Sequence, residues 1–308
     1  MTGPTGLAEA IARHGVALAA FDVDGTLLTS DHRVTDRLVA AVAGARAAGV
    51  EIVLASSRGA SALRPVLATL GLDEPGVPFV AAGGAFVGTR DGAGALVPLA
   101  HRPAPLAGAR AFARSALAAG LAVGWYAGDD WYVAQPDATI EAEIRVVGVE
   151  PTVVAASAMT QDPSARPAEP IGADAGALPA PDKILVMAPE GRMAAVEALR
   201  ADLPPGQSAQ TSNPTFLEIN GAGVDKAVAL ADLASERGLP TYGLLAMGDG
   251  PNDAAMLALA GLAVVPANAR EAARAHADVV VPSNDEYGAA IVLEALARRS
   301  AARPEGRR

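Results

Sequence analysis

Short apolar runs alternate with amphipathic segments in the N-terminal part of the chain. The runs at residues 16–21, 50–55 and 77–82 are too short for buried helices, and polar or glycine-rich residues follow each of them. This pattern is typical of strands that are buried on both faces. Residues 38–45 and 60–70 have the apolar spacing of helices that cover a sheet. The alternation predicts a parallel sheet with crossover helices.

The same alternation returns near the C-terminus after a long interruption. From residue 224 onwards, short apolar runs again alternate with segments of helical spacing. Residues 88–219 instead mix helical segments with hairpin patterns, as α+β units do. We therefore expect an α/β fold with a doubly wound, Rossmann-like parallel-sheet core. Residues 1–87 and 220–308 would form this core, and residues 88–219 would form an inserted α+β domain.

Two segments of the insertion have patterns of their own. Residues 156–181 contain five prolines, which predicts the least ordered part of the chain. Four of the eleven aromatic residues lie close together, namely Trp125, Tyr126, Trp131 and Tyr132. They indicate a hairpin whose rings pack into the core of the insertion, and lining of a substrate pocket remains the alternative. Arg145 and Lys183 are candidates to contact an anionic substrate.

Composition narrows the possible functions. The 308 residues include 24 Lys and Arg against 34 Asp and Glu, a net charge of −10, which makes nucleic acid an unfavourable partner. The absence of cysteine excludes thiolate nucleophiles and Cys-ligated metals. The four histidines share no metal-ligand spacing and are expected at the surface. No long apolar run or signal-peptide pattern is present, so we expect a cytoplasmic protein without membrane contact; the oligomeric state stays open.

Carboxylates follow two of the predicted strands. The chemically active side chains after strands are Asp22, Asp24, Ser56, Asp249 and Asp253, and Lys226 lies in the first turn of a helix. Ligands bind beyond the carboxyl ends of parallel strands, so we expect these groups to converge. Clustered carboxylates either raise one another's pKa or require a cation, and oxygen ligands without His or Cys favour Mg²⁺. Together with a lysine and a hydroxyl group they predict a phosphoryl-binding site, at which one aspartate attacks and another transfers protons.

These motifs resemble those of the haloacid dehalogenase (HAD) superfamily. Residues 21–28, Phe-Asp-Val-Asp-Gly-Thr-Leu-Leu, are similar to its first motif, and Ser56, Lys226 and the acidic segment 248–253 follow in the family's order. The amino-acid sequences of this segment and of residues 283–288 are most similar to those of Cof-type phosphatases. The insertion falls where the family places its larger type of cap domain.

The resemblance implies a role for each of the carboxylates. Asp22 would be the nucleophile and a metal ligand. Asp24 would be the general acid and base, with its main-chain carbonyl on the metal. Asp249 would be the second carboxylate ligand, and Asp253 would support the Mg²⁺ shell.

The resemblance also implies phosphate and substrate contacts. Ser56, Lys226 and Asn252 would hold the phosphate, while Arg58 and Gly84 would lie in loops near the substrate. Two departures concern these loops: many Cof-type sequences have glycine where Ser57 stands, and many have Asn-Gly where this chain has two glycines.

The resulting hypothesis is a Mg²⁺-dependent phosphatase that acts on a small phosphorylated metabolite, such as a sugar phosphate, through an aspartyl-phosphate intermediate. One alternative is a phosphomutase or phosphotransferase of the same superfamily. The other is a HAD-fold binding protein without catalytic activity.

Overall fold

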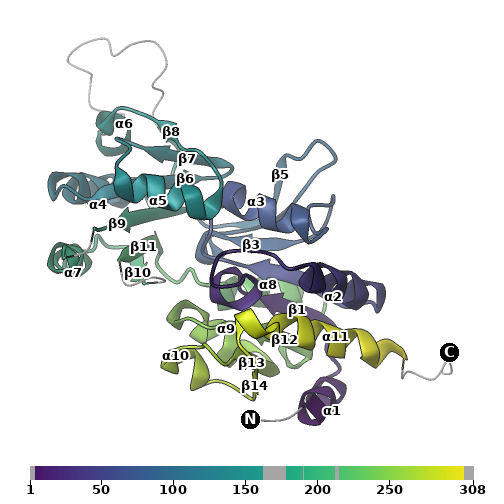
Figure 1. Ribbon diagram of the computed structural model, residues 1–308. Coiled ribbons are helices and arrows are strands. Elements are labelled where there is room, and N and C mark those ends of the chain that lie inside the picture. Colours follow the sequence, from purple (N-terminus) through teal and green to yellow (C-terminus); the bar gives the residue numbers. More distant parts are fainter. Residues whose placement is uncertain (1–3, 162–177, 190, 212–214, 302–308) are drawn as a thin grey trace.

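Two β-sheets, each flanked by helices, organise the molecule. The computed structural model describes residues 4–161, 178–189, 191–211 and 215–301. Figure 1 shows the chain passing from the larger sheet to the smaller one and back again. Within the described ranges, no helix combines the length and the apolar character that a membrane span requires.

The larger sheet has eight strands and contains both the first and the last strand of the described chain. In sheet order, its strands are β14 (Val279–Val281), β13 (Leu262–Pro266), β12 (Leu244–Met247), β1 (Leu18–Phe21), β2 (Glu51–Ala55), β3 (Phe79–Ala81), β4 (Phe86–Arg90) and β5 (Leu96–His101). Neighbouring strands from β14 to β3 pair in parallel, whereas β4 and β5 add an antiparallel edge. The α/β fold expected from the sequence is confirmed.

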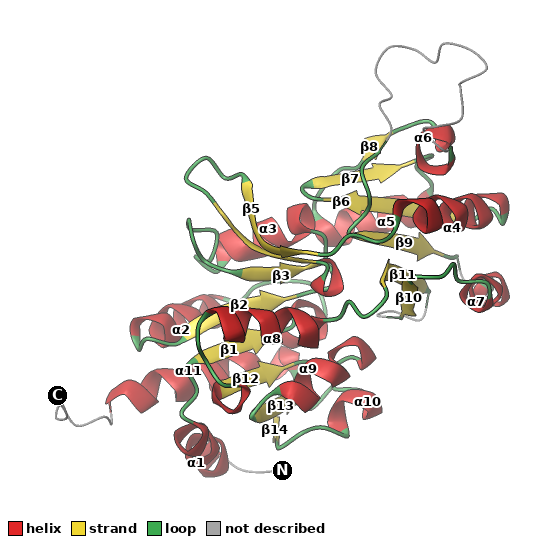
Figure 2. Ribbon diagram, turned by 180° about the vertical axis from the view of Figure 1, so that it is seen from behind, coloured by secondary structure: helices red, strands yellow, loops and turns green. Residues whose placement is uncertain are grey.

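Helices cover both faces of the larger sheet (Figure 2). One face packs against α1 (Pro4–His14), α2 (Asp36–Ala47), α3 (Ala60–Thr69) and α11 (Gly288–Ala301). The other face packs against α8 (Lys226–Glu236), α9 (Ala254–Leu259) and α10 (Glu271–Arg274). Successive side chains of a strand point to opposite faces, so Phe21 joins the first core and Ala20 the second. This double burial explains why the strand sequences are apolar throughout.

The smaller sheet has six strands. In sheet order, they are β10 (Gln207–Gln210), β11 (Phe216–Gly221), β9 (Lys183–Met187), β6 (Ala122–Ala127), β7 (Asp130–Val133) and β8 (Thr152–Val153). Helices α4 (Leu106–Ala118), α6 (Ala156–Thr160) and α7 (Met193–Ala201) cover one face. The other face packs against α5 (Ala138–Val147) and reaches Ala62 of α3, so it is turned toward the larger sheet.

The chain crosses between the two sheets after β5 and after β11. Strand β5 ends at His101, so residues 88–101 of the predicted insertion pair with the larger sheet, and β11 runs on to Gly221. The division into a core of residues 1–87 and 220–308 and an inserted domain remains a prediction. Most of the proline-rich segment, residues 162–177, lies outside the described residues.

Candidate active site

The loop after β1 is held against the end of β12. The backbone N–H of Asp22 donates to the carbonyl of Met247 at 2.8 Å, which aligns the ends of the two strands. At Gly25 φ is +80°, and a β-carbon there would lie 2.6 Å from a carboxylate oxygen of Asp249. Glycine therefore permits both the turn and the close approach of Asp249. The hydroxyl of Thr26 donates to the same carboxylate at 3.1 Å.

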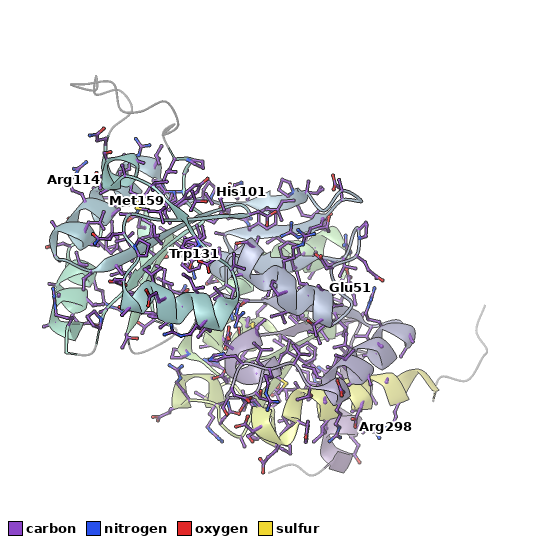
Figure 3. All side chains as sticks on the ribbon, turned by 45° about the horizontal axis from the view of Figure 1, so that its top comes forward. Glu51, His101, Arg114, Trp131, Met159 and Arg298 are labelled. Atoms are coloured by element: carbon purple, nitrogen blue, oxygen red, sulfur yellow. The ribbon has the colours of Figure 1, made fainter. Side chains whose placement is uncertain are left out.

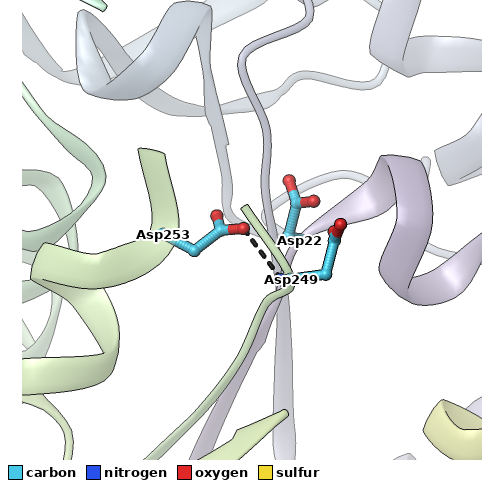
Figure 4. A group of neighbouring side chains, drawn as sticks. All are labelled: Asp22, Asp249 and Asp253. Atoms are coloured by element: carbon cyan, nitrogen blue, oxygen red, sulfur yellow. Dashed lines mark hydrogen bonds between the residues drawn. The ribbon is translucent and has the colours of Figure 1, made fainter. Parts of the chain in front are cut away.

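Three buried carboxylates converge at these strand ends (Figure 4). One oxygen atom each of Asp22, Asp249 and Asp253 lies within 4.8 Å of the other two. Lys226 Nζ donates to Oδ1 of Asp22 and to Oδ1 of Asp253, both at 2.6 Å. The other oxygen of Asp253 accepts hydrogen bonds from the backbone N–H groups of Asp249 and Gly250 at 3.0 and 2.8 Å. Within this cluster, one lysine faces three carboxylates.

The pKa values reflect this excess of negative charge. Burial, followed by the charge of Asp253, raises the pKa of Asp22 well above its usual range and that of Asp249 to about 6. Burial alone would lower the pKa of Lys226, but Asp22 and Asp253 raise it above its ordinary value. Opposite charges stabilise the ionised forms, so a further cation would relieve the repulsion. Among the described residues, the three members of this cluster are all buried carboxylates, and oxygen ligands of this kind suit a hard divalent ion.

Asp24 has partners different from those of the cluster. Arg58 forms two parallel hydrogen bonds to its carboxylate, at 2.8 and 2.7 Å, and His32 Nδ1 lies 3.3 Å from Oδ1. Burial opposes ionisation, but the hydrogen bonds from Arg58 and His32 prevail and hold the pKa of Asp24 far below its usual range. In this arrangement Asp24 is therefore a carboxylate.

A cavity of about 250 Å³ lies over these groups, between the two sheets. From the larger sheet and its loops, it is lined by Asp22, Asp24, Arg58, Asp249, Asn252 and Arg270. From the smaller sheet and α5, it is lined by Tyr126, Glu143, Lys183, Leu185, Phe216 and Glu218. Asp22 and Asp249 of the carboxylate cluster thus lie on the floor of a cavity whose opposite wall comes from the other sheet.

A comparison of the whole chain with models of known protein families assigns it to one of them. The sequence model of the family of haloacid dehalogenase-like hydrolases matches residues 19–293. The chain belongs to this family. As a HAD-like hydrolase it is an enzyme, and the phosphatases among its relatives place it with the phosphatases.

Individual relatives agree with this assignment. The Bacillus subtilis protein named "Putative phosphatase YxeH" is 26% identical over 280 residues, which cover 91% of this chain and 97% of YxeH. Another Bacillus subtilis protein, 5-amino-6-(5-phospho-D-ribitylamino)uracil phosphatase YcsE, is 40% identical over 79 residues, which cover 26% of this chain and only 32% of YcsE. Among solved structures, the HAD phosphatase BT1666 of Bacteroides thetaiotaomicron has a TM-score of 0.69 at 26% identity, over 92% of this chain and 96% of that one.

The residues of the predicted HAD motifs divide into those that line the cavity and those that do not. Asp22 and Asp249, which belong to the carboxylate cluster, line the cavity together with Asp24, Arg58 and Asn252. Ser56, Gly84, Lys226 and Asp253 are buried and are not among the residues that line it. The roles assigned to all these residues remain predictions.

Ser56 and Gly84 instead make contacts that shape the backbone near the site. The hydroxyl of Ser56 accepts the backbone N–H of Arg58 at 3.1 Å. At Gly84 φ is +109°, and a β-carbon would lie 2.2 Å from the carbonyl oxygen of Asp225, at the start of α8. This close contact places the N-terminus of α8, and with it Lys226, beside the site.

Two asparagines, Asn268 and Asn284, hold the loop after β1, a role that the sequence analysis did not assign to them. The side chain of Asn268 donates to the carbonyl of Gly25 at 2.8 Å, and that of Asn284 donates to the carbonyl of Leu28 at 2.8 Å. The Asn284 backbone N–H in turn donates to the Asn268 side chain at 3.0 Å. His32 is exposed, as expected, but its contact with Asp24 was not foreseen.

The aromatic cluster has mixed roles. The rings of Trp125 and Trp131 (the latter labelled in Figure 3) are buried, as the core-packing interpretation predicts. Tyr126 is also buried, but it stacks on Trp131 with ring centroids 5.4 Å apart and lines the cavity. Of the two cations considered, Arg145 is exposed and outside the lining, whereas Lys183 lines the cavity.

Proposed function

We propose that this HAD-like hydrolase is a Mg²⁺-dependent phosphatase that acts on a small phosphorylated metabolite through an aspartyl-phosphate intermediate. The observation that carries the proposal is the convergence of three buried carboxylates and Lys226 beneath the cavity, into which Asp22 and Asp249 of this cluster are exposed as lining residues. The cavity volume of about 250 Å³ is below that of typical drug-sized ligand sites, which supports a small substrate.

The carboxylate cluster supports the proposed metal. Asp22 and Asp249 would ligate Mg²⁺, the main-chain carbonyl of Asp24 would complete the protein ligands, and Asp253 would orient the loop through its two backbone hydrogen bonds. When bound there, Mg²⁺ would supply positive charge to the oxygens of a phosphoryl group and favour in-line attack on it.

Asp22 is the proposed nucleophile. One of its carboxylate oxygens forms a bond to phosphorus as the bond from phosphorus to the substrate oxygen breaks, and the leaving alkoxide takes a proton from Asp24. Water then attacks the same phosphorus, gives its proton to Asp24 and releases inorganic phosphate, which restores Asp22. Lys226 holds Asp22 in position and favours its ionised form, because its ammonium group donates a hydrogen bond of 2.6 Å to that carboxylate.

The pairing of Asp24 with Arg58 bears on this cycle. An ionised Asp24 is ready for the base role in the second half of the reaction, but the acid role needs a proton on this carboxyl group. The substrate phosphate offers Arg58 an alternative bidentate partner. We therefore expect Arg58 to release Asp24 when the phosphate binds, so that Asp24 takes up a proton.

The test is phosphate release from phosphorylated metabolites and a generic aryl phosphate, in Mg²⁺ or in EDTA. Wild type should release phosphate only with Mg²⁺. Asp22→Asn should lose turnover, because an amide is a poor nucleophile, whereas the exposed control Asp36→Asn should match wild type. The folds of both variants are checked by circular dichroism.

Other outcomes would favour the alternatives. Substantial turnover by Asp22→Asn would refute the covalent mechanism. An isomerised sugar phosphate without free phosphate would identify a mutase, and tight metabolite binding without turnover would identify a binding protein.

A further inference from the structure

The wall of the cavity that faces the carboxylate cluster contains two more acidic side chains. Glu143 comes from α5 and Glu218 from β11 of the smaller sheet, and the lining from this sheet has one cation, Lys183. Lys183 Nζ donates to the carbonyl of Ser57 at 2.6 Å and lies 3.8 Å from Glu218. It also lies 4.9 Å from the centroid of the Tyr126 ring. These contacts already engage the Lys183 ammonium group.

Helix α5 places Glu143 on this wall. Asp137 caps the helix by accepting the backbone N–H groups of residues 139 and 140, and Gly148 ends it in the left-handed conformation. Ile140 and Val147 are buried against the sheet, and Glu143 lies between them, three residues after one and four before the other. Residues with this spacing share one face of a helix, so Glu143 is carried on the buried face.

The carboxylate of Glu143 has little compensation. No hydrogen bond to it is found within the described ranges, although charged groups surround it. Burial raises its pKa above the usual range, and the charges of Lys183 and Arg58 lower it too little to offset this effect. The cations are committed elsewhere, since Arg58 pairs with Asp24 and Lys183 has the contacts given above. An uncompensated, partly buried carboxylate favours a hydrogen-bond donor as its partner.

We propose that Glu143 selects the leaving group: its carboxylate accepts hydrogen bonds from hydroxyl groups of the substrate and repels a second anionic group. The inference rests on the proposed phosphatase function and narrows the substrate class to phosphomonoesters of neutral polyhydroxy compounds. The remainder of the wall fits this class, because the ring of Tyr126 and the side chains of Leu185 and Phe216 offer an apolar surface to the C–H faces of such a molecule.

The experiment compares two substrates of the same length that differ in one terminal group. Sorbitol phosphate ends in a hydroxymethyl group, and phosphogluconate carries a carboxylate at that end. Phenyl phosphate, which has neither, reports on the chemical step alone. Values of kcat/KM are measured with Mg²⁺ for wild type, for Glu143→Gln and for Glu141→Gln, an exposed glutamate of the same helix that is not among the lining residues.

Wild type should use sorbitol phosphate at least about tenfold better than phosphogluconate, because like charges disfavour the anionic group. Glu143→Gln should reduce this preference about tenfold by removing the negative charge, while its kcat/KM for phenyl phosphate, which has neither a hydroxyl group nor a carboxylate, should change by a much smaller factor. Glu141→Gln should leave all three values unchanged.

Two results would overturn the inference without affecting the proposed function. One is a wild-type preference for phosphogluconate, and the other is an unchanged substrate preference in Glu143→Gln, each with phenyl phosphate still hydrolysed. Failure to hydrolyse phenyl phosphate and both sugar phosphates would instead count against the proposed function. A parallel loss of activity on all substrates in Glu143→Gln would show a structural role and would also refute the selection of the leaving group.

Discussion

Removal of the Lys226 ammonium group should strongly destabilise the metal-free protein. The side chain is 1% exposed and its Nζ lies 2.6 Å from both Asp22 and Asp253. At an effective dielectric constant of about 20, each contact corresponds to an attraction of about 6 kcal/mol, against which the desolvation of the ions must be set. Loss of one partner from a buried ion pair costs about 3–5 kcal/mol, because the other charge stays buried without compensation. We expect this loss for Lys226→Met, since methionine replaces most of the buried volume.

Urea unfolding in EDTA near neutral pH measures this loss. The folded-state pKa of Lys226 is raised, so its stabilisation is complete below the ordinary value of 10.5 and is lost only as the pH rises through the folded-state pKa. The matched control is Lys183→Met at the chain's other lysine, which is 3% exposed but lies 3.8 Å from its carboxylate partner. Lys183→Met should lose less stability than Lys226→Met.

A double variant tests the electrostatic origin of the effect. Adding Asp253→Asn to Lys226→Met removes one of the uncompensated charges, so the double variant should lose less stability than the sum of the two single losses. Mg²⁺ should likewise reduce the loss caused by Lys226→Met. A loss below about 1 kcal/mol, or strict additivity in the double variant, would refute the reasoning.

Two further predictions concern stability. The pKa of Asp249 is about 6 in the folded protein against an ordinary 3.8, so the folded state binds this proton more tightly and loses stability as the pH rises between these values. In EDTA above this range, Asp249→Asn should therefore be more stable than wild type by up to about 3 kcal/mol, and urea unfolding curves of equal pH dependence for both proteins would contradict this. Gly84→Ala should lower the melting temperature much more than Gly71→Ala: both sites have positive φ, but the new β-carbon would lie 2.2 Å from the Asp225 carbonyl oxygen at the first site and has nothing within 4 Å at the second. Equal shifts would show that backbone strain alone matters.

Much of the larger sheet was predictable from local patterns. A strand buried on both faces must be apolar along its length. The apolar runs of β1, β2 and β12 can therefore be recognised as strands from the sequence alone. The antiparallel edge of β4 and β5 was not foreseen, because residues 88–101 were assigned to the insertion. The pairing of these strands depends on which sheet offers them a free edge, and a local pattern does not contain that information.

The sequence by itself determined which groups meet on the floor of the cavity. Parallel strands carry their C-terminal loops to the same edge of a sheet, so Asp22 and Asp249 had to approach each other once β1 and β12 were neighbours. Only the tertiary structure decided what surrounds them. The pairing of Arg58 with Asp24 depends on the conformations of the loops that follow the neighbouring strands β2 and β1. The position of Glu143 opposite the cluster depends on how the two sheets pack. That packing is set by contacts between residues far apart in the chain, which no local periodicity encodes.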